Sequence, residues 1–261
     1  MTILKHELRQ GRTAFWIWTV SIGFLLAVCV CLFPEMKGEM AGVSKIFSAM
    51  GAFTAAFGMD KLNFGTMVGY YAIECGNVLG LGGAFYAALC GVDILSKEEG
   101  GRTAEFLLTH PVTRARILTE KLLSVFARIT ALNVIVYVIS AASIIVIKEP
   151  VPWKELNLLH LAYYLLGLEM AGICFGISAF QRKGSAGTGL GIAAIFYFLN
   201  LVANISKSAR VLKYLTPFGY CDGADIVSDG KLNAAMVAVG AAICVLSILA
   251  AFRKYLRKDI Q

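Results

Sequence analysis

Six long apolar stretches constrain this chain more than any other feature. They cover residues 14–33, 69–92, 122–147, 158–180, 186–205 and 232–252, and short polar segments separate most of them. A helix rises about 1.5 Å per residue, so roughly 20 helical residues cross the hydrocarbon core of a bilayer. We therefore predict an all-α integral membrane protein with six transmembrane helices and a single domain over residues 1–261.

The composition favours the same class of protein. Hydrophobic residues make up 58% of the chain and charged residues 16%, whereas a soluble domain carries about 25% charged residues. The net charge of +7 is typical of membrane proteins, which concentrate Lys and Arg in cytoplasmic loops. No basic stripe with interleaved aromatic residues lies outside the apolar stretches, so we predict no nucleic-acid partner.

The seven cysteines give no sign of metal chemistry. Most fall inside apolar stretches, and none forms a CxxC or zinc-like spacing. A cysteine in such a stretch behaves as a small hydrophobic residue. We predict neither a disulfide framework nor a metal site.

The N-terminal dozen residues are predicted to form a short helix at the membrane interface. Ile3, Leu4 and Leu8 lie near one helical face with charged residues around them, although a frayed basic tail is equally compatible with the composition. The apolar run that follows is too long for a signal peptide, and no A-x-A cleavage site comes after it. We expect a retained membrane anchor.

The distribution of basic residues predicts the orientation. With the N-terminus inside, the cytoplasmic segments hold fourteen Lys and Arg residues and the external segments nine, which places both termini in the cytoplasm. Residues 43–59 carry one charge, Lys45. A seventh span there would move the loop at 93–121 outside, so we interpret the segment as external, either amphipathic or re-entrant.

The cytoplasmic loop between the second and third spans has the clearest local pattern. Ser96 and Glu99 have the spacing of a capping box, and the following Gly-Gly pair allows a sharp change of direction. A short helix is predicted over 103–109, because Pro111 must end it. Such a helix between two long spans is suited to transmit movement.

The same short helix offers an apolar surface to the cytoplasm. Phe106, Leu107 and Leu108 lie where there is no lipid to bury them, which suggests a protein partner. Packing of these residues against the bundle's own cytoplasmic face is the other interpretation, which periodicity alone slightly favours.

At these residues the loop resembles that of ABC-2 type transporter permeases. The features that carry the resemblance are Glu98, Glu99, Gly100, Gly101, Thr103, Glu105, Leu107, Leu108, Pro111, Arg114 and Lys121. The stretch from Leu212 to Asp225 is similar to the external segment before the last span in that family. The resemblance covers essentially the whole chain as one ABC-2 type transmembrane domain.

The resemblance implies a specific function. Such permeases pair with a second permease subunit, identical or homologous, and each loop presents a coupling helix to an ATP-binding cassette subunit that drives export. The implied contact residues are Glu98, Glu99, Gly100, Gly101, Thr103, Glu105, Phe106, Leu107, Leu108, Pro111 and Arg114. ATP and Mg²⁺ would bind that partner. The implied location is the cytoplasmic membrane of a bacterium.

Motifs for chemistry in this chain itself are missing from the sequence. It contains no G-x-x-x-x-G-K-[ST] phosphate loop, no H-E-x-x-H and no G-x-S-x-G. We expect no cofactor bound by this chain and no catalysis by it. An ion-coupled secondary transporter is the main alternative function, and a permease-like scaffold or sensor without transport is another. The transported substrate is not predicted.

Polar residues inside the spans are further candidates, because burying them in lipid is costly. Arg128 and Glu169 lie on consecutive spans, and we predict that they form a pair, more readily a structural ion pair than a substrate site. Snorkelling of Arg128 to the inner interface is the alternative. Asn200 and Asn204 lie one turn apart on the fifth span and are predicted to hydrogen-bond across a dimer interface or to line a path.

Small residues form three seams along the spans. The second span has Gly80, Gly83, Ala84, Ala87 and Ala88, while Gly-x-x-x-Gly pairs occur at Gly172/Gly176 and Gly187/Gly191. Such seams let helices approach closely. Packing within the chain explains most of them, and a dimer interface near the second and fifth spans is the sharper hypothesis.

Overall fold

The structure is a computed structural model that describes residues 2–38, 51–59, 61–101, 112–181 and 184–257. Its described residues form helices and no strands, and six helical spans are long and apolar enough to cross a membrane. The predicted all-helical, six-span class is therefore confirmed. The spans are α2 (Arg12–Met36), α5–η1–α6 (Met67–Val92), α9 (Arg114–Val146), α10 (Trp153–Ser178), α11 (Ala186–Ile205) and α13 (Ala234–Arg257).

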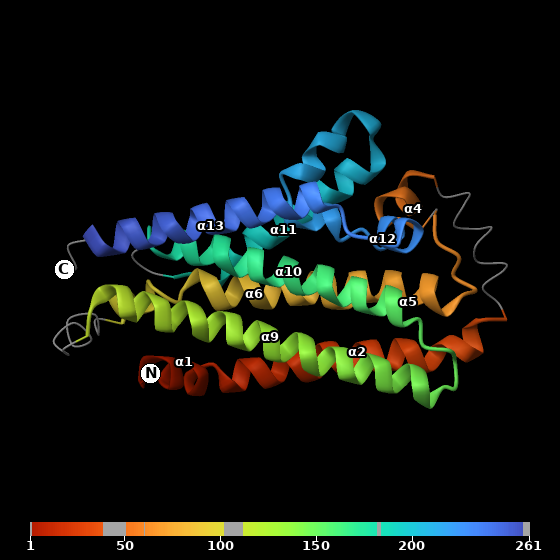
Figure 1. Ribbon diagram of the computed structural model, residues 1–261, viewed down its shortest axis with the longest axis horizontal. Helices are drawn as coiled ribbons and strands as arrows, with labels where there is room; N and C mark the ends of the chain where they lie inside the picture. Colours follow the sequence, from red (N-terminus) through yellow and green to blue (C-terminus); the bar gives the residue numbers. More distant parts are fainter. Residues whose placement is uncertain (1, 39–50, 60, 102–111, 182–183, 258–261) are drawn as a thin grey trace.

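Helix α10 lies at the centre of an elongated bundle (Figure 1) and packs against α6, α9 and α13. In its most apolar stretch 72% of the residues are buried within the chain, against 17% in α11 and α13 and 28% in α2. The outer faces of these peripheral helices carry exposed aliphatic and aromatic side chains. Such faces are suited to lipid or to another membrane subunit.

The second span is interrupted by a π-helical segment, η1 (Gly76–Leu81), between α5 (Met67–Cys75) and α6 (Gly82–Val92). Two of its glycines lie against Tyr163 of α10, where a Cβ at Gly80 would approach a ring carbon to 2.9 Å. The Tyr163 hydroxyl donates a hydrogen bond to the Cys221 carbonyl at 3.1 Å. The irregular turn therefore lets α10 approach closely, a common role for such bulges.

Most of the small-residue seams are used inside the chain. A Cβ at Gly91 would lie 2.5 Å from the Ala171 carbonyl, so α6 and α10 are in near-backbone contact. Gly176 lies against Ser247 of α13 in the same way. In the fifth span, by contrast, nothing in the described structure lies within 4 Å of a Cβ at Gly191. The packing interpretation therefore holds for the second and fourth spans.

Short helices gather at the upper right of the bundle in Figure 1 and cap this side of it. These are α4 (Ala52–Ala56), the 3-10 helices η2 (Lys207–Tyr214) and η3 (Pro217–Tyr220), and α12 (Gly223–Asp229). Helix α4 packs on α11, held by a 3.0 Å hydrogen bond from Asn204 Nδ2 to the Ala56 carbonyl. Residues 51–59 of the 43–59 segment thus form a cap and not a span, and the segment's earlier part lies outside the described residues.

Candidate coupling site

The opposite end of the bundle gathers the N-terminal helix, the start of the 93–121 loop and the ends of α9 and α13. Helix α1 (Thr2–Gln10) is followed directly by α2 and packs along α9. Leu4 N donates to Glu120 Oε2 at 3.1 Å, and Arg116 Nε holds the other oxygen of Glu120 at 2.9 Å. Residues Thr2–Gln10 therefore form an ordered helix rather than a frayed tail.

A buried lysine joins three of these elements. The Lys121 side chain on α9 is completely buried, and its ammonium donates to Glu7 Oε1 at 2.9 Å and to the Ile94 carbonyl at 2.8 Å. It also forms an ion pair with Glu98. Because an ammonium has three donors, these three partners match its hydrogen-bonding capacity. Lys121 thus connects α1, the loop and α9.

The second oxygen of Glu7 is also paired. Lys97 Nζ lies 2.5 Å from Glu7 Oε2 and 2.8 Å from Gln10 Oε1. Burial alone would raise the pKa of the Glu7 carboxyl, but the charges and hydrogen bonds of Lys121 and Lys97 outweigh it and hold the pKa below its ordinary value. Glu7 is therefore a buried carboxylate stabilised in its charged form by two lysines.

The first half of the loop is fixed to the end of α10. Ser178 Oγ accepts hydrogen bonds from Leu95 N at 3.0 Å and Ser96 N at 3.3 Å, which satisfies two donors just after α6 ends. A single helical turn, α7 (Lys97–Gly100), follows. It begins after Ser96 and ends at Gly100, where the sequence predicted the break.

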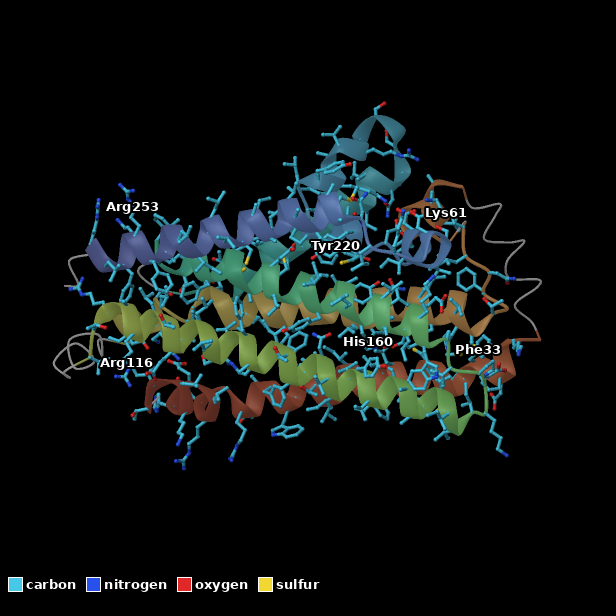
Figure 2. The ribbon with its side chains drawn as sticks, in the orientation of Figure 1. Phe33, Lys61, Arg116, His160, Tyr220 and Arg253 are labelled. Atoms are coloured by element: carbon cyan, nitrogen blue, oxygen red, sulfur yellow. The ribbon has the colours of Figure 1, made fainter. Side chains whose placement is uncertain are left out.

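The second half of the loop is anchored again where α9 begins. Thr113 caps α9 by accepting a hydrogen bond from Arg116 N at 3.3 Å. Arg114 Nη1 donates to the Tyr255 carbonyl near the end of α13 at 3.4 Å. The intervening stretch of the loop therefore starts and ends at positions fixed on α1, α9, α10 and α13. Figure 2 shows Arg116 and Arg253 at this end and Lys61 at the other.

Only part of the predicted contact set can be placed. Gly100 and Gly101 close α7, Glu98 is paired with Lys121, and Arg114 contacts α13. The side chain of Glu99 and the whole of Thr103, Glu105, Phe106, Leu107, Leu108 and Pro111 lie outside the described residues. The predicted short helix over 103–109 therefore remains a prediction.

The predicted pairing of Arg128 with Glu169 is wrong. Both side chains are described, and they form no ion pair with each other. Arg128 points from α9 towards Gly11 at the α1–α2 junction. Glu169 lies on the other side of α10, against Gly240 of α13 and beside Tyr220. Hydropathy placed both residues in spans but does not determine which way each helix face is turned.

The two asparagines of α11 face inwards near the capped end. Asn200 and Asn204 line a small cavity of about 60 Å³ together with Asn77 of the π-helical turn. Asn204 holds α4, and the Oδ1 atoms of both α11 asparagines are buried without a hydrogen-bond partner among the described residues. Of the two predicted roles, lining an internal space fits better than bonding across the open face of α11.

Sequence reasoning missed the Glu7–Lys121 pair. Lys121 was named only for the family resemblance, and the charged residues of the N-terminal helix, which include Glu7, were predicted only to surround its apolar face. The partners are 114 residues apart along the chain, so no local periodicity connects them. The one signal in the sequence was that Glu7 and Lys121 carry opposite charges next to the first and third apolar stretches, at ends that lie on the same side of the membrane.

The fold and this end together define a multi-pass membrane protein with six spans, a docked N-terminal helix and a loop anchored to four helices. The family described as ABC-2 family transporter protein matches residues 1–260, and the chain belongs to that family. It is accordingly a membrane permease of an ABC transporter, a family whose members associate with an ATP-binding cassette subunit. A comparison with curated proteins gave no match.

Proposed function

We propose that the chain is the permease subunit of an ATP-driven exporter, with ATP hydrolysis supplied by a separate ATP-binding subunit at the α1–α7–α9 end. ATP and Mg²⁺ would bind to that subunit. The positive-inside rule puts this end, which holds the larger share of Lys and Arg, in the cytoplasm. The location we propose is the cytoplasmic membrane of a bacterium.

The observation that carries the proposal is the anchoring of the loop by Lys121. A force applied to the loop would reach α9 through Lys121 and α1 through Glu7, because these contacts are buried and shorter than 3 Å. Ser178 links the same loop to α10, the most buried span. A partner that moves the loop would therefore move the core of the bundle, which is what coupling requires.

The second permease subunit is proposed to pack on α11. This helix leaves Ile195, Phe198 and Val202 exposed, and nothing in the described structure covers its Gly191 position. Close helix approach in a membrane uses such small residues. Whether the second subunit is identical or homologous would follow from which chains co-purify.

The test is co-purification of the tagged chain in mild detergent, followed by identification of bound proteins and an ATPase assay. We expect a stoichiometric ATP-binding subunit, and replacement of Phe106, Leu107 and Leu108 by Asp should weaken its retention about tenfold or more, since buried apolar anchors dominate interfaces. The matched control replaces Val211 and Leu215, which are exposed at the opposite end, and should retain the subunit.

Two results would contradict the proposal. Full retention of the ATP-binding subunit by the triple Asp variant would exclude the loop as its docking site. Transport that follows a proton or sodium gradient and needs no ATP would instead favour a secondary transporter.

A further inference from the structure

A cavity of about 270 Å³ lies beside the Lys121 network, between α1, α2, α6 and α9. Its lining includes Gly11 and the polar or aromatic residues Gln10, Trp18, Tyr86, Asp93 and Arg128. The side chains of Arg128, Tyr86 and Asp93 take no part in the anchoring of the loop described above. The ligand that suits the cavity can be deduced from these groups and from its depth in the membrane.

Arg128 supplies a cation with spare donors. Within the described structure its one hydrogen bond runs from Nε to the Ser124 carbonyl at 3.3 Å, which leaves both terminal nitrogens of the guanidinium available. A Cβ at Gly11 would overlap this group, so the absence of a side chain there makes room for it. A guanidinium with two free nitrogens is a strong phosphate ligand.

Tyr86 adds a neutral donor in the wall. Its side chain is 2% exposed, and its hydroxyl forms no hydrogen bond with the described residues, with only the weakly polar Cys90 thiol beside it. A buried phenol normally has a partner. A ligand oxygen in the cavity would satisfy it.

Asp93 supplies the opposite charge. Its carboxylate interacts electrostatically with Lys97 and Arg128, yet in the described structure it closes no ion pair with either. The other two charges on the cavity wall, Glu7 and Lys97, are already paired with each other. Among the described residues, the cavity therefore offers one available cation and one available anion, and this arrangement matches a zwitterion.

The position of the cavity fits the headgroup layer of the membrane. The basic residues of α1 and the first residue of α2, Arg12, are exposed just outside it, while exposed apolar side chains begin a turn further along α2. Trp16, Ile17, Val20 and Phe24 are between 50% and 65% exposed and continue from the cavity into the depth of the bilayer. Acyl chains could lie along this face while the headgroup occupies the cavity.

We propose that the cavity binds the headgroup of a zwitterionic aminophospholipid, with the phosphate on Arg128 and Tyr86 and the ammonium on Asp93. Basic pockets between spans near the cytoplasmic surface are general lipid-headgroup sites. The additional carboxylate selects a headgroup with a primary ammonium, because its N–H groups can donate hydrogen bonds to Asp93 whereas a quaternary ammonium has none to donate. The site depends on the membrane location of the chain and not on the proposed ATP-binding partner.

The experiment is native mass spectrometry of the delipidated, detergent-purified transporter after addition of phosphatidylethanolamine, phosphatidylcholine or phosphatidylglycerol, with soluble phosphoethanolamine as a further arm. We expect tightest retention of phosphatidylethanolamine. Arg128→Gln should weaken it about tenfold or more, the effect of losing charge-assisted hydrogen bonds. Asp93→Asn should remove the preference over phosphatidylcholine. The control, Arg253→Gln, removes an exposed charge at the same end.

Gly11→Ala is a second variant that keeps every ligand group and should also weaken retention, because the added methyl displaces the guanidinium. Equal binding of the lipid by Arg128→Gln and the unaltered chain would overturn the proposal. So would tighter binding of phosphatidylglycerol, or binding of soluble phosphoethanolamine as tightly as the lipid, which would identify a soluble phosphate compound as the ligand.

Discussion

Both ends of the bundle are held by lysine–carboxylate clusters, but they differ in their exposure to water. At the α1–α7–α9 end the side chains of Lys121 and Glu7 are 0% and 4% exposed. At the capped end Lys61 and Asp225 are 51% and 45% exposed, although their 3.0 Å separation is as short. The distances are alike and the surroundings are not.

This contrast determines what each cluster contributes. A charge removed from a buried pair leaves its partner desolvated and uncompensated, which is strongly destabilising. Removing one charge of an exposed pair costs little stability, because water and salt ions replace the missing partner. The inner cluster is therefore suited to hold α1, the loop and α9 as one unit, whereas the exposed Lys61–Asp225 pair of the outer cluster can open and close at small cost.

The largest expected effect follows from Lys121→Met. It leaves Glu7 and Glu98 without the ammonium that lies between them, and the expected loss is about 3–5 kcal/mol of unfolding free energy. Thermal unfolding in detergent measures it, and Arg253→Met, an exposed charge on α13, is the control with little change. Equal midpoints for the two variants would refute the structural importance of this cluster.

A second substitution tests whether the loss comes from the uncompensated charge. Adding Glu7→Gln to Lys121→Met removes a buried negative charge that would otherwise lack one of its lysines. The double variant should therefore be more stable than the sum of the two single losses predicts, by roughly 1 kcal/mol or more of coupling energy. Simple additivity would show that the two residues act independently.

A smaller effect is expected from acid. The pKa of Glu7 is lowered in the folded chain. Its charge therefore stabilises the docked α1 fully at pH values above about 4.3, the pKa of a glutamate carboxyl in the unfolded chain. That stabilisation is lost as the pH falls through the lower folded value. Proteolysis within α1 should therefore accelerate as the pH is lowered below about 4, measured with an acid-active protease. Glu7→Gln should be cleaved readily at every pH, and an unchanged acid step in that variant would assign the step to another group.

The same contrast explains which parts of the molecule could be predicted from sequence. The six spans follow from local hydropathy, which decides between water and lipid within about 20 residues. Helix α9 begins at Arg114, before the apolar stretch at 122–147, and in this extension Glu120 and Lys121 are paired with Arg116, Glu7 and Glu98. A hydropathy count treats such charges as the end of a span.

The candidate site divides in the same way. Gly100 and Gly101 were assigned to a break in the loop because their effect is local, and α7 does end there. The partners of Arg128 and Glu169 depend on how α9 and α10 are rotated, and the sequence gives both faces enough apolar residues to pack. The fixed points of the loop, Ser178 and Lys121, are equally invisible because they come from other helices.

The smallest expected loss of stability comes from the outer cluster, where two carboxylates bind the same lysine but differ in their exposure to water. Lys213 bonds both Asp222 at 3.2 Å and Asp225 at 3.1 Å, so Asp225→Asn leaves it one partner, and the expected loss is below about 1 kcal/mol and falls further with added salt. Asp222 has a side chain only 7% exposed and also caps α12 through Ala224 N at 3.1 Å. Asp222→Asn keeps the capping oxygen but removes a buried charge, so it should cost more than Asp225→Asn and respond less to salt. Thermal unfolding of both variants at low and high ionic strength makes the comparison. Equal losses with equal salt dependence would mean that exposure does not set the strength of these pairs, and would remove the basis for contrasting the two ends.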